Sequence, residues 1–511
     1  MIVLSTLALM TVVGTVVDLH TDFDEDVKIS DDNNNKEDKN CDKERHYKNN
    51  NNNKTSVWLR VCRAFSMRIN ARDLFKTTPA QLNCVQGLRF FSMCWVIYAH
   101  TILYTDYQSF THMFASMENN LTNFFLLPTL NANFSVDTFF LISGLLTSYG
   151  TYRMTNGKVN RFKSFYFVLS RYIRLTPQLV IVMLMFLLLP LIGEGPMLNG
   201  KMEYEAGKCY RFWWVNMLYL QAFYNNELCI GPAWWVSVEM FFHISSALIL
   251  AIMLRNTRAG MLLTFMFTSA LTLLGAYIHY TGGFTIQALP TIPQRYEVDG
   301  EQAYLFFHKP YPHAASFFIG LALGFVIARN NNVNINANSD NNFNDDTSNS
   351  DDKSHKVERL NAAQVRSLWV ACWASFVVIF WAPYYWNMGA AYTQLQSTVY
   401  YNACQIVWPM CIAWIIYACV YGHAGLINSI LSSCVFTPLG RISYMTYLSH
   451  AIVVYYSSYS GHVTVEPTFL TFMYLHISNT VLSLVLGFIL TIVYESPILR
   501  LTKLLFALMF P

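Results

Sequence analysis

The chain has 511 residues, of which 54% are apolar, 16% are aromatic and only 13% are charged. That balance excludes a soluble globular protein of this length and places the chain in a membrane. The formal net charge of +3 is unevenly distributed, because lysine and arginine gather in a few loops, and nothing in it indicates a nucleic-acid partner.

Eleven apolar segments are long enough to cross about 30 Å of hydrocarbon. They lie near residues 2–18, 86–105, 134–150, 175–193, 234–254, 260–280, 312–329, 366–384, 398–420, 434–456 and 470–494. These segments lack the alternating pattern of barrel strands, and backbone groups in lipid must be satisfied internally. The sequence therefore predicts an all-α polytopic membrane helix bundle with about 11 transmembrane helices.

The first apolar segment resembles a secretory signal in length, but it lacks a basic start and a clear small-x-small cleavage site. Removing it would leave residues 21–83, with their twelve lysines and arginines, outside the cell and would invert every later basic loop. We therefore expect residues 1–20 to form a leading transmembrane span whose N-terminus lies outside the cell or in the lumen.

Two stretches rich in asparagine and aspartate interrupt the apolar pattern. One fills the linker 21–83 up to about residue 56, and the other is an insertion at residues 330–356. With so few large apolar residues, neither can offset the entropy cost of ordering, so both are expected to be disordered cytosolic segments. A plain linker and a partner-binding segment are the two interpretations. After the linker we expect a transmembrane core at residues 84–498, which contains the second stretch as an insertion, and then a cytosolic tail at 499–511.

Basic residues alternate between loops as the positive-inside rule requires. Residues 151–174 hold six lysines and arginines, whereas residues 106–133 hold none. The first loop is expected in the cytosol together with the C-terminus, and the second outside or in the lumen. The plasma membrane and the endoplasmic reticulum are the two candidate locations.

The outer loops carry candidate modification sites. Asn120 and Asn133 each begin an Asn-x-Ser/Thr triplet and are possible N-glycosylation sites, although Asn133 lies close to the predicted membrane boundary. Cys209 and Cys229 share one polar outer loop, where a disulfide is as plausible as two free thiols. The eleven cysteines form no CxxC pair and no ligand set with histidine, so no metal site is predicted.

Arg89 and His100 are ionisable residues within one apolar segment. They are eleven residues apart, which on a helix is three turns plus about 20° and about 16 Å of rise. They therefore share one helix face. Charged groups inside a membrane tend to mark function, although Arg89 snorkelling to headgroups and His100 bonding a neighbouring helix is the structural alternative.

Further polar residues are expected in the outer half of the bundle, at a depth similar to that of His100. They are Asp137, Glu239, His243 and His450. Ser443 and Tyr447 share one helix side with His450, at i, i+4 and i+7, and are expected to support the site or the acceptor. Asp137 has an alternative role as a helix cap, and His243 and His450 as bonds between helices. A histidine of near-neutral pKa beside a carboxylate is suited to taking a proton from a hydroxyl, so the group predicts acid–base chemistry.

On the cytosolic side, Arg171 and Arg174 lie one turn apart where a helix enters the membrane, with Arg89 expected nearby. Arginine forms bidentate contacts with phosphate, so this basic mouth is a candidate site for the phosphates of coenzyme A. A simple positive-inside anchor explains the same residues equally well.

Several motifs together resemble the acyltransferase type 3 superfamily, in its animal nose-resistant-to-fluoxetine branch, which includes the insect drop-dead-like proteins. They are CVQGLRFFSMCWVIYAHT, VDTFFLISGLL, RYIRLTP, PAWWVSVEMFF, HKPYPHAASFFIGLALGF, ISYMTYLSH and YESPILRLTK. The resemblance covers about residues 8 to 505. It implies a ten-helix core that transfers acyl groups from acyl-coenzyme A to a hydroxylated acceptor.

The resemblance also assigns roles to residues. It implies that Arg89 binds the donor, that His100 is the catalytic base, and that Arg171 and Arg174 lie near the donor phosphates. Glu239 occupies the acidic position after the tryptophan motif. The chain departs from the branch in reading Glu239-Met240-Phe241 where Asp-Met-Gln is usual, and in having His313 where arginine is usual.

A further departure concerns the start of the chain. The branch usually carries a cysteine-rich extracellular domain ahead of the first span, and this sequence begins at the span. It is therefore expected to be either a short member or an incomplete gene product.

The sequence as a whole favours a membrane O-acyltransferase in which His100 activates an acceptor hydroxyl with help from Glu239 or Asp137. Acyl-coenzyme A is the expected donor, no cofactor is permanently bound, and the acceptor is a lipid, a glycan or a small molecule. The alternative is a lipid or small-molecule transport protein on the same scaffold, since fold does not imply function.

Overall fold

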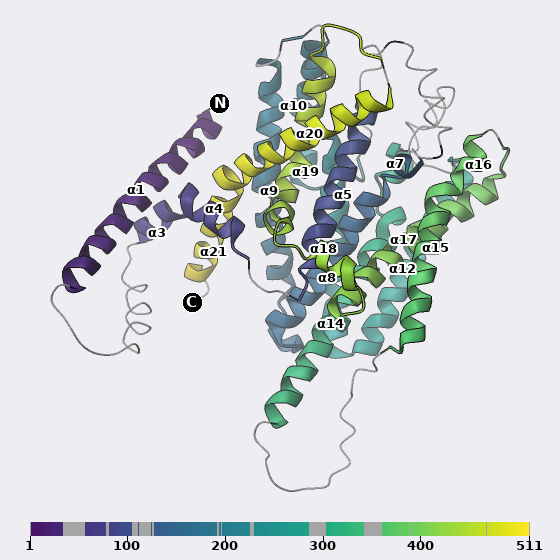
Figure 1. Cartoon of the computed structure of the whole chain (residues 1–511), viewed down its shortest axis with the longest axis horizontal. Helices are drawn as coiled ribbons and strands as arrows, with labels where there is room; N and C mark the ends of the chain where they lie inside the picture. Colours follow the sequence, from purple (N-terminus) through teal and green to yellow (C-terminus); the bar gives the residue numbers. More distant parts are fainter. Residues whose placement is uncertain are drawn as a thin grey trace.

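The computed structural model of the chain describes residues 2–33, 57–77, 81–104, 127–191, 194–195, 197–224, 229–285, 303–341, 360–388, 390–466 and 468–509, together with Thr111 and Phe124. Within these ranges the elements are α-helices joined by short 3-10 and π-helical turns, so the predicted all-α class is confirmed (Figure 1). The glycosylation candidate Asn120 and most of the two asparagine-rich stretches lie outside the described residues.

The helices follow one another along the whole chain. They are α1 (Ile2–Asn33), α3 (Val57–Ala64), α4 (Met67–Phe75), α5 (Cys84–Leu103), α7 (Leu127–Leu130), α8 (Phe134–Thr155), α9 (Ser164–Leu188), α10 (Leu198–Met217), α11 (Trp234–Arg255), α12 (Thr257–Thr281), α14 (Ala314–Asn341), α15 (Ala362–Trp381), α16 (Pro383–Asn387), α17 (Gln394–Val420), α18 (Gly425–Leu431), α19 (Phe436–Tyr459), α20 (Phe469–Leu490) and α21 (Ser496–Met509).

Seven helices of the described chain are long and apolar enough to cross a membrane. These candidate spans are Ser164–Leu191, Gly231–Arg255, Thr257–Thr281, Tyr311–Asn332, Ala362–Asn387, Gln394–Val420 and Phe469–Leu505. A shorter apolar helix covers Leu4–His20. The integral membrane class is therefore confirmed, whereas the count of eleven spans and the leading span at residues 1–20 stay predictions.

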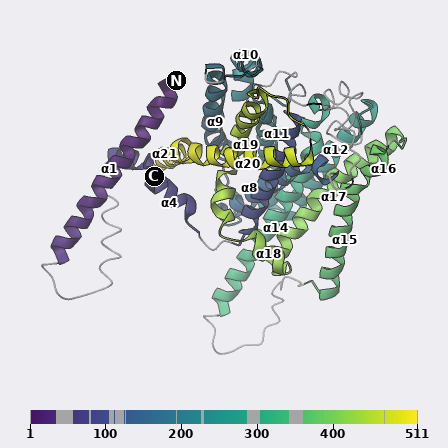
Figure 2. The same cartoon turned by 45° about the horizontal axis from the view of Figure 1, so that its top comes forward.

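Three more helices have the length of a span but carry more polar side chains. They are α5, α8 and α19, with 20, 22 and 24 residues. At least half of the residues of each are buried, so their polar groups contact neighbouring helices instead of lipid. These three helices carry Arg89, His100, Asp137 and His450, and they lie in the middle of the bundle in Figures 1 and 2.

Hydrogen bonds between helix ends identify one common face of the bundle. Gln81, just ahead of α5, bonds Asn331 of α14 at 3.0 Å and Tyr149 of α8 at 3.5 Å. Asn330 donates to the hydroxyl of Tyr421, just after α17, at 3.2 Å. We call this end of the bundle the basic face, because the turn that follows α8 there is rich in cations. Its basic residues are Arg153, Lys158, Arg161 and Lys163.

Helices α8 and α14 pack with their backbones in close contact. A Cβ atom added at Gly144 would collide with the carbonyl oxygen of Phe317, and one added at Gly320 would collide with that of Leu141. Only a residue without a side chain permits this approach, which is typical of helix pairs inside membranes. The contact fixes Asp137 of α8 beside the start of α14.

We expect Gly320→Ala to destabilise the folded protein by about 1–3 kcal/mol, because the added methyl group meets immobile backbone atoms. Gly150, which is also in α8, has open space around it, with no atom within 4 Å of where a Cβ would lie, so Gly150→Ala is the matched control. That change should be neutral or stabilising by up to about 1 kcal/mol, since alanine favours a helix over glycine. Chemical unfolding of both variants in detergent measures the difference, and equal stabilities would contradict the close packing.

The N-terminal helices form an arm beside the bundle. The hydroxyl of Thr11 in α1 donates to the carbonyl of Val493 at 3.2 Å, and the hydroxyl of Tyr494 donates to the carbonyl of Leu4 at 3.3 Å. Figures 1 and 2 both place α1 at the edge of the molecule, and Figure 1 shows α3 and α4 between it and the remaining helices. The two chain ends therefore meet at the same side of the bundle.

Candidate active site

Helix α5 carries both Arg89 and His100 without interruption between them. Their spacing places them on one side of the helix, about 16 Å apart along its axis. Both side chains keep part of their surface exposed. The helix thus connects two polar centres, one around each residue.

The first centre is a pair of histidines. Nδ1 of His100 lies 2.6 Å from Nε2 of His450, and the planes of the two rings are nearly parallel, with an interplanar angle of 16°. Nδ1 of His450 in turn lies 2.6 Å from the carbonyl oxygen of Tyr447. His450 is fully buried, so this bond fixes its ring within α19.

These contacts determine where the protons are in the neutral pair. A carbonyl oxygen only accepts, so Nδ1 of His450 carries a hydrogen and its Nε2 is the acceptor. Nδ1 of His100 must then donate to that acceptor, which leaves the lone pair of His100 on Nε2. The second bond therefore selects the tautomer of the partly exposed ring, as a triad's third member does for its histidine.

Two more rings border His100. The ring of Tyr104 is parallel to it at 4.7 Å between centroids, with an interplanar angle of 7°. His308 lies within electrostatic range of His100 and stacks on Trp234 at 4.8 Å. Burial, together with the nearby His313 and Lys309, lowers the pKa of His308 to about 3, so His308 is neutral at physiological pH. His308 was not predicted as a site residue, although it falls in the HKPYPH motif.

The second centre gathers three arginines, Arg89, Arg171 and Arg174. Arg171 of α9 forms an ion pair with Glu239 of α11, and both bond the hydroxyl of Ser143 in α8. Arg89 lies within electrostatic range of Arg171, Arg174 and Glu239. The structure therefore brings together the arginines that the sequence expected near one another, with the counter-charge on a further helix.

The three arginines differ in what they contact. Arg171 is ion-paired with Glu239, which is fully buried. Arg174 is exposed, and within the described chain no hydrogen bond joins Arg174 or Arg89 to a partner. A phosphate approaching this centre would therefore find Arg89 and Arg174 available. Among the described residues, no group of three histidine, cysteine or acidic side chains is arranged to hold a metal ion.

A third polar group lies between α8 and α14. Oδ1 of Asp137 is 2.9 Å from Nδ1 of His313 and 2.8 Å from the hydroxyl of Ser316, and all three side chains are buried. Nε2 of His313 is 2.8 Å from the carbonyl of Phe307, so His313 also joins the loop that carries His308. Asp137 is thus a link between helices and not a helix cap.

The structure corrects the expected partnership between His100 and a carboxylate. Glu239 pairs with Arg171, and Asp137 pairs with His313. In the residues that the structure covers, the hydrogen-bond partner of His100 is His450. Both carboxylates are already engaged by their own helix neighbours, so a histidine takes the place that we expected a carboxylate to hold.

Other expected site residues have structural contacts. Nε2 of His243 is 3.2 Å from the carbonyl of Phe167 and its ring stacks on that of Phe167 at 4.0 Å, which is the interhelical role that the sequence allowed. The hydroxyl of Ser443 donates to the carbonyl of Gly440 within its own helix. Tyr447 contributes its carbonyl to His450, while its hydroxyl donates to the carbonyl of Pro232 at 3.0 Å.

The outer-loop expectations differ in their outcomes. Cys209 and Cys229 form a disulfide that ties the middle of α10 to the chain ahead of α11. Asn133 directly precedes α8, and only 9% of its surface is exposed. A glycan needs an accessible amide, so the folded state does not favour modification of Asn133, and glycosylation there stays a prediction.

Comparisons with known proteins cover nearly the whole bundle. A family model for the acyltransferase domain matches residues 82–495. Nose resistant to fluoxetine protein 6 of Caenorhabditis elegans is 24% identical over 481 residues, which are 88% of this chain and 54% of that protein. Regulator of hypoxia-inducible factor 1 of the same organism is 22% identical over 464 residues, which are 87% of this chain and 84% of that protein.

The chain therefore spans about half the length of the first of these relatives. No solved structure matches it. The matched residues 82–495 include every polar centre described above, from Arg89 on α5 to His450 on α19. The chain belongs to the acyltransferase type 3 family of membrane proteins and is similar to its nose-resistant-to-fluoxetine animal branch.

Proposed function

We propose that this protein is an O-acyltransferase that moves an acyl group from acyl-coenzyme A to a hydroxyl of a lipid, a glycan or a small molecule. One observation supports this most strongly. The bond between His100 and His450 leaves a lone pair on Nε2 of a partly exposed histidine, which is what a general base requires. The family membership supports the same reaction class.

The donor would lie along α5. Arg89 and Arg174 are charged, and guanidinium groups are suited to phosphate, so they would bind the phosphates of coenzyme A near the basic face. Arg171 would act indirectly, because its pairing with Glu239 holds it in place while it adds positive potential. With the basic face in the cytosol, as the positive-inside rule favours, the donor arrives from the cytosol.

In the proposed reaction His100 takes one proton from the acceptor and returns it to the leaving group. Nε2 of His100 takes the proton of the acceptor hydroxyl while the hydroxyl oxygen attacks the thioester carbonyl carbon. The new C–O bond forms, the C–S bond breaks, and the proton on Nε2 passes to the sulfur of the leaving coenzyme A. The imidazolium that forms between these steps keeps its Nδ1–H bond to His450, so its orientation does not change.

Purified full-length protein in lipid nanodiscs tests this function. We expect incubation with an acyl-coenzyme A mixture and a lipid extract to yield free coenzyme A and one new ester, both detected by mass spectrometry. Protein that moves a labelled lipid or drug-like molecule across vesicles, with no release of coenzyme A, would be a transporter and would contradict the proposal. The ester itself identifies the acyl group and the acceptor.

His450 is proposed as a positioning residue for His100. We expect His450→Ala to lower kcat about tenfold with little change in KM, since one hydrogen bond that selects the tautomer is lost. His450→Gln keeps an acceptor oxygen and should recover part of that loss. The pH dependence of kcat separates this role from plain packing, because only loss of the bond to His100 changes the pKa that the profile reports. An unchanged profile in both variants would contradict the role.

A further inference from the structure

A pocket of about 490 Å³ lies between α3, α4 and α21, away from the polar centres described above. Four of its lining residues are basic, and they come from two distant parts of the sequence. These cations are Arg60, Arg63, Arg500 and Lys503. Apolar side chains, including Leu59 and Leu504, complete the lining, so the pocket joins positive charge to an apolar wall.

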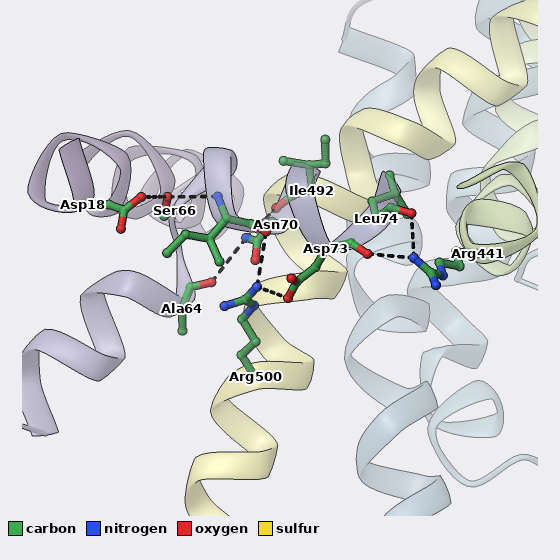
Figure 3. Close-up of polar contacts among 10 residues, drawn as sticks. Asp18, Ala64, Ser66, Asn70, Asp73, Leu74, Arg441, Ile492 and Arg500 are labelled. Carbon is green, nitrogen blue, oxygen red and sulfur yellow. Dashed lines mark hydrogen bonds and ion pairs between the residues drawn. The ribbon is translucent and has the colours of Figure 1, made fainter. Parts of the chain in front are cut away.

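Ion pairs with residues that do not line the pocket hold two of its arginines in place. Nε of Arg63 is 3.5 Å from Asp18 of α1, whose other oxygen accepts from the hydroxyl of Ser66 at 2.8 Å. Arg500 forms an ion pair with Asp73 and also donates to the carbonyl of Ile69 (Figure 3). Neither of these two carboxylates lines the pocket, and the charged side chains among its described lining residues are cations.

The surrounding helices carry the marks of a membrane interface. The side chain of Trp58 in α3 is 75% exposed, and that of Phe75 at the end of α4 is 56% exposed. Residues 57–77 contain five basic residues and a single acidic one. A basic, amphipathic segment with exposed aromatic rings is typical of helices that lie on an anionic lipid surface.

We propose that this pocket binds the phosphate headgroup of an anionic phospholipid. A phosphate monoester, such as the headgroup of phosphatidic acid, carries between one and two negative charges at neutral pH, which suits the four cations among the described lining residues. The apolar wall and the exposed Trp58 suit a ligand whose acyl chains remain in the membrane. The lipid then joins the N-terminal arm to α21, because its headgroup contacts α3 and α21 together.

This site is separate from the donor site. None of the three arginines near Glu239 lines the pocket. The proposal therefore does not depend on the acyltransferase function, and binding can be measured without acyl-coenzyme A.

The test measures retention of phosphatidic acid by the delipidated full-length protein, using native mass spectrometry with phosphatidylcholine as competitor. We expect the double variant Arg60→Gln/Lys503→Gln to bind phosphatidic acid about 25-fold more weakly, about fivefold for each cation removed. The matched control is Arg255→Gln/Arg258→Gln, which removes two exposed arginines from the turn between α11 and α12. The control should bind as the unchanged protein does.

Three outcomes would overturn the proposal. They are equal binding by the pocket and control variants, no preference for phosphatidic acid over phosphatidylcholine, and full displacement of the lipid by inorganic phosphate, which would indicate a soluble phosphate ligand. If the double variant does not fold, Lys503→Gln alone provides the test, because its exposed side chain is not needed for packing. That single change should weaken binding about fivefold.

Discussion

His100→Ala should leave a folded protein whose acyl transfer is about 10²–10⁴-fold slower, the usual loss when a well-placed general base is removed. The side chain is partly exposed, and its hydrogen-bond partner in the described chain is His450, so its removal costs little packing. Release of free coenzyme A from acyl-coenzyme A, measured under saturating donor, reports the rate directly.

The matched control for this variant is His476→Ala. His476 is also a histidine within a long apolar helix, where it contacts Tyr98 edge-on and bonds Thr480 at 3.3 Å, outside both polar centres. Its removal should leave kcat within about threefold of the unchanged protein, since it has no place in the proton path. Near-normal acyl transfer by folded His100→Ala would rule out His100 as the base, whatever the control shows.

Helical periodicity was sufficient to predict how Arg89 and His100 are related. Both lie on one helix, so their common side follows from the eleven-residue spacing and needs no tertiary information. The membrane class likewise follows from composition. These are local properties, which a sequence encodes directly.

The same reasoning could not predict which side chains of distant helices contact each other. His450 was identified as a candidate, but its bond to His100 joins residues 350 positions apart, and no local pattern encodes that contact. The same holds for Asp137 and His313, which are 176 positions apart. Glu239 was expected at the depth of His100, but it lies in the centre around Arg89, because which residues meet depends on helix rotation and packing.

The share of polar side chains in a long helix also indicates whether that helix lies inside the bundle. The interior helices α5, α8 and α19 are not among the seven helices that are apolar enough to cross a membrane by composition, whereas α12 and α15 are. All five helices have similar lengths. Helices at the lipid boundary need apolar side chains all round, while interior helices bond through polar ones. A weaker apolar signal therefore marks α5, α8 and α19, which carry Arg89, His100, Asp137 and His450, but it does not mark α9 and α11, which carry Arg171 and Glu239 and are strongly apolar.

Glu239→Ala should destabilise the protein by about 3–5 kcal/mol, the second large effect that the structure predicts. Glu239 is fully buried against Arg171 and Ser143, so removing its carboxylate leaves a guanidinium among helices without its counter-charge. Replacing both partners, in Arg171→Met/Glu239→Leu, should recover much of the loss, because the orphaned charge is then removed as well. Unfolding by denaturant in detergent, followed by helical circular dichroism, compares the three proteins.

An exposed ion pair supplies the contrast that makes this test decisive. Asp73 pairs with Arg500, but 59% of its side chain is exposed, so Asp73→Ala should cost no more than about 1 kcal/mol. Equal losses from Glu239→Ala and Asp73→Ala would mean that the Arg171–Glu239 pair is hydrated, and that Glu239 does not hold Arg171 inside the bundle. A large loss that the double variant recovers would instead establish Glu239 as a structural counter-charge. Its position after the tryptophan motif would then reflect the need to place Arg171 beside Arg89, and proton transfer would be left to His100.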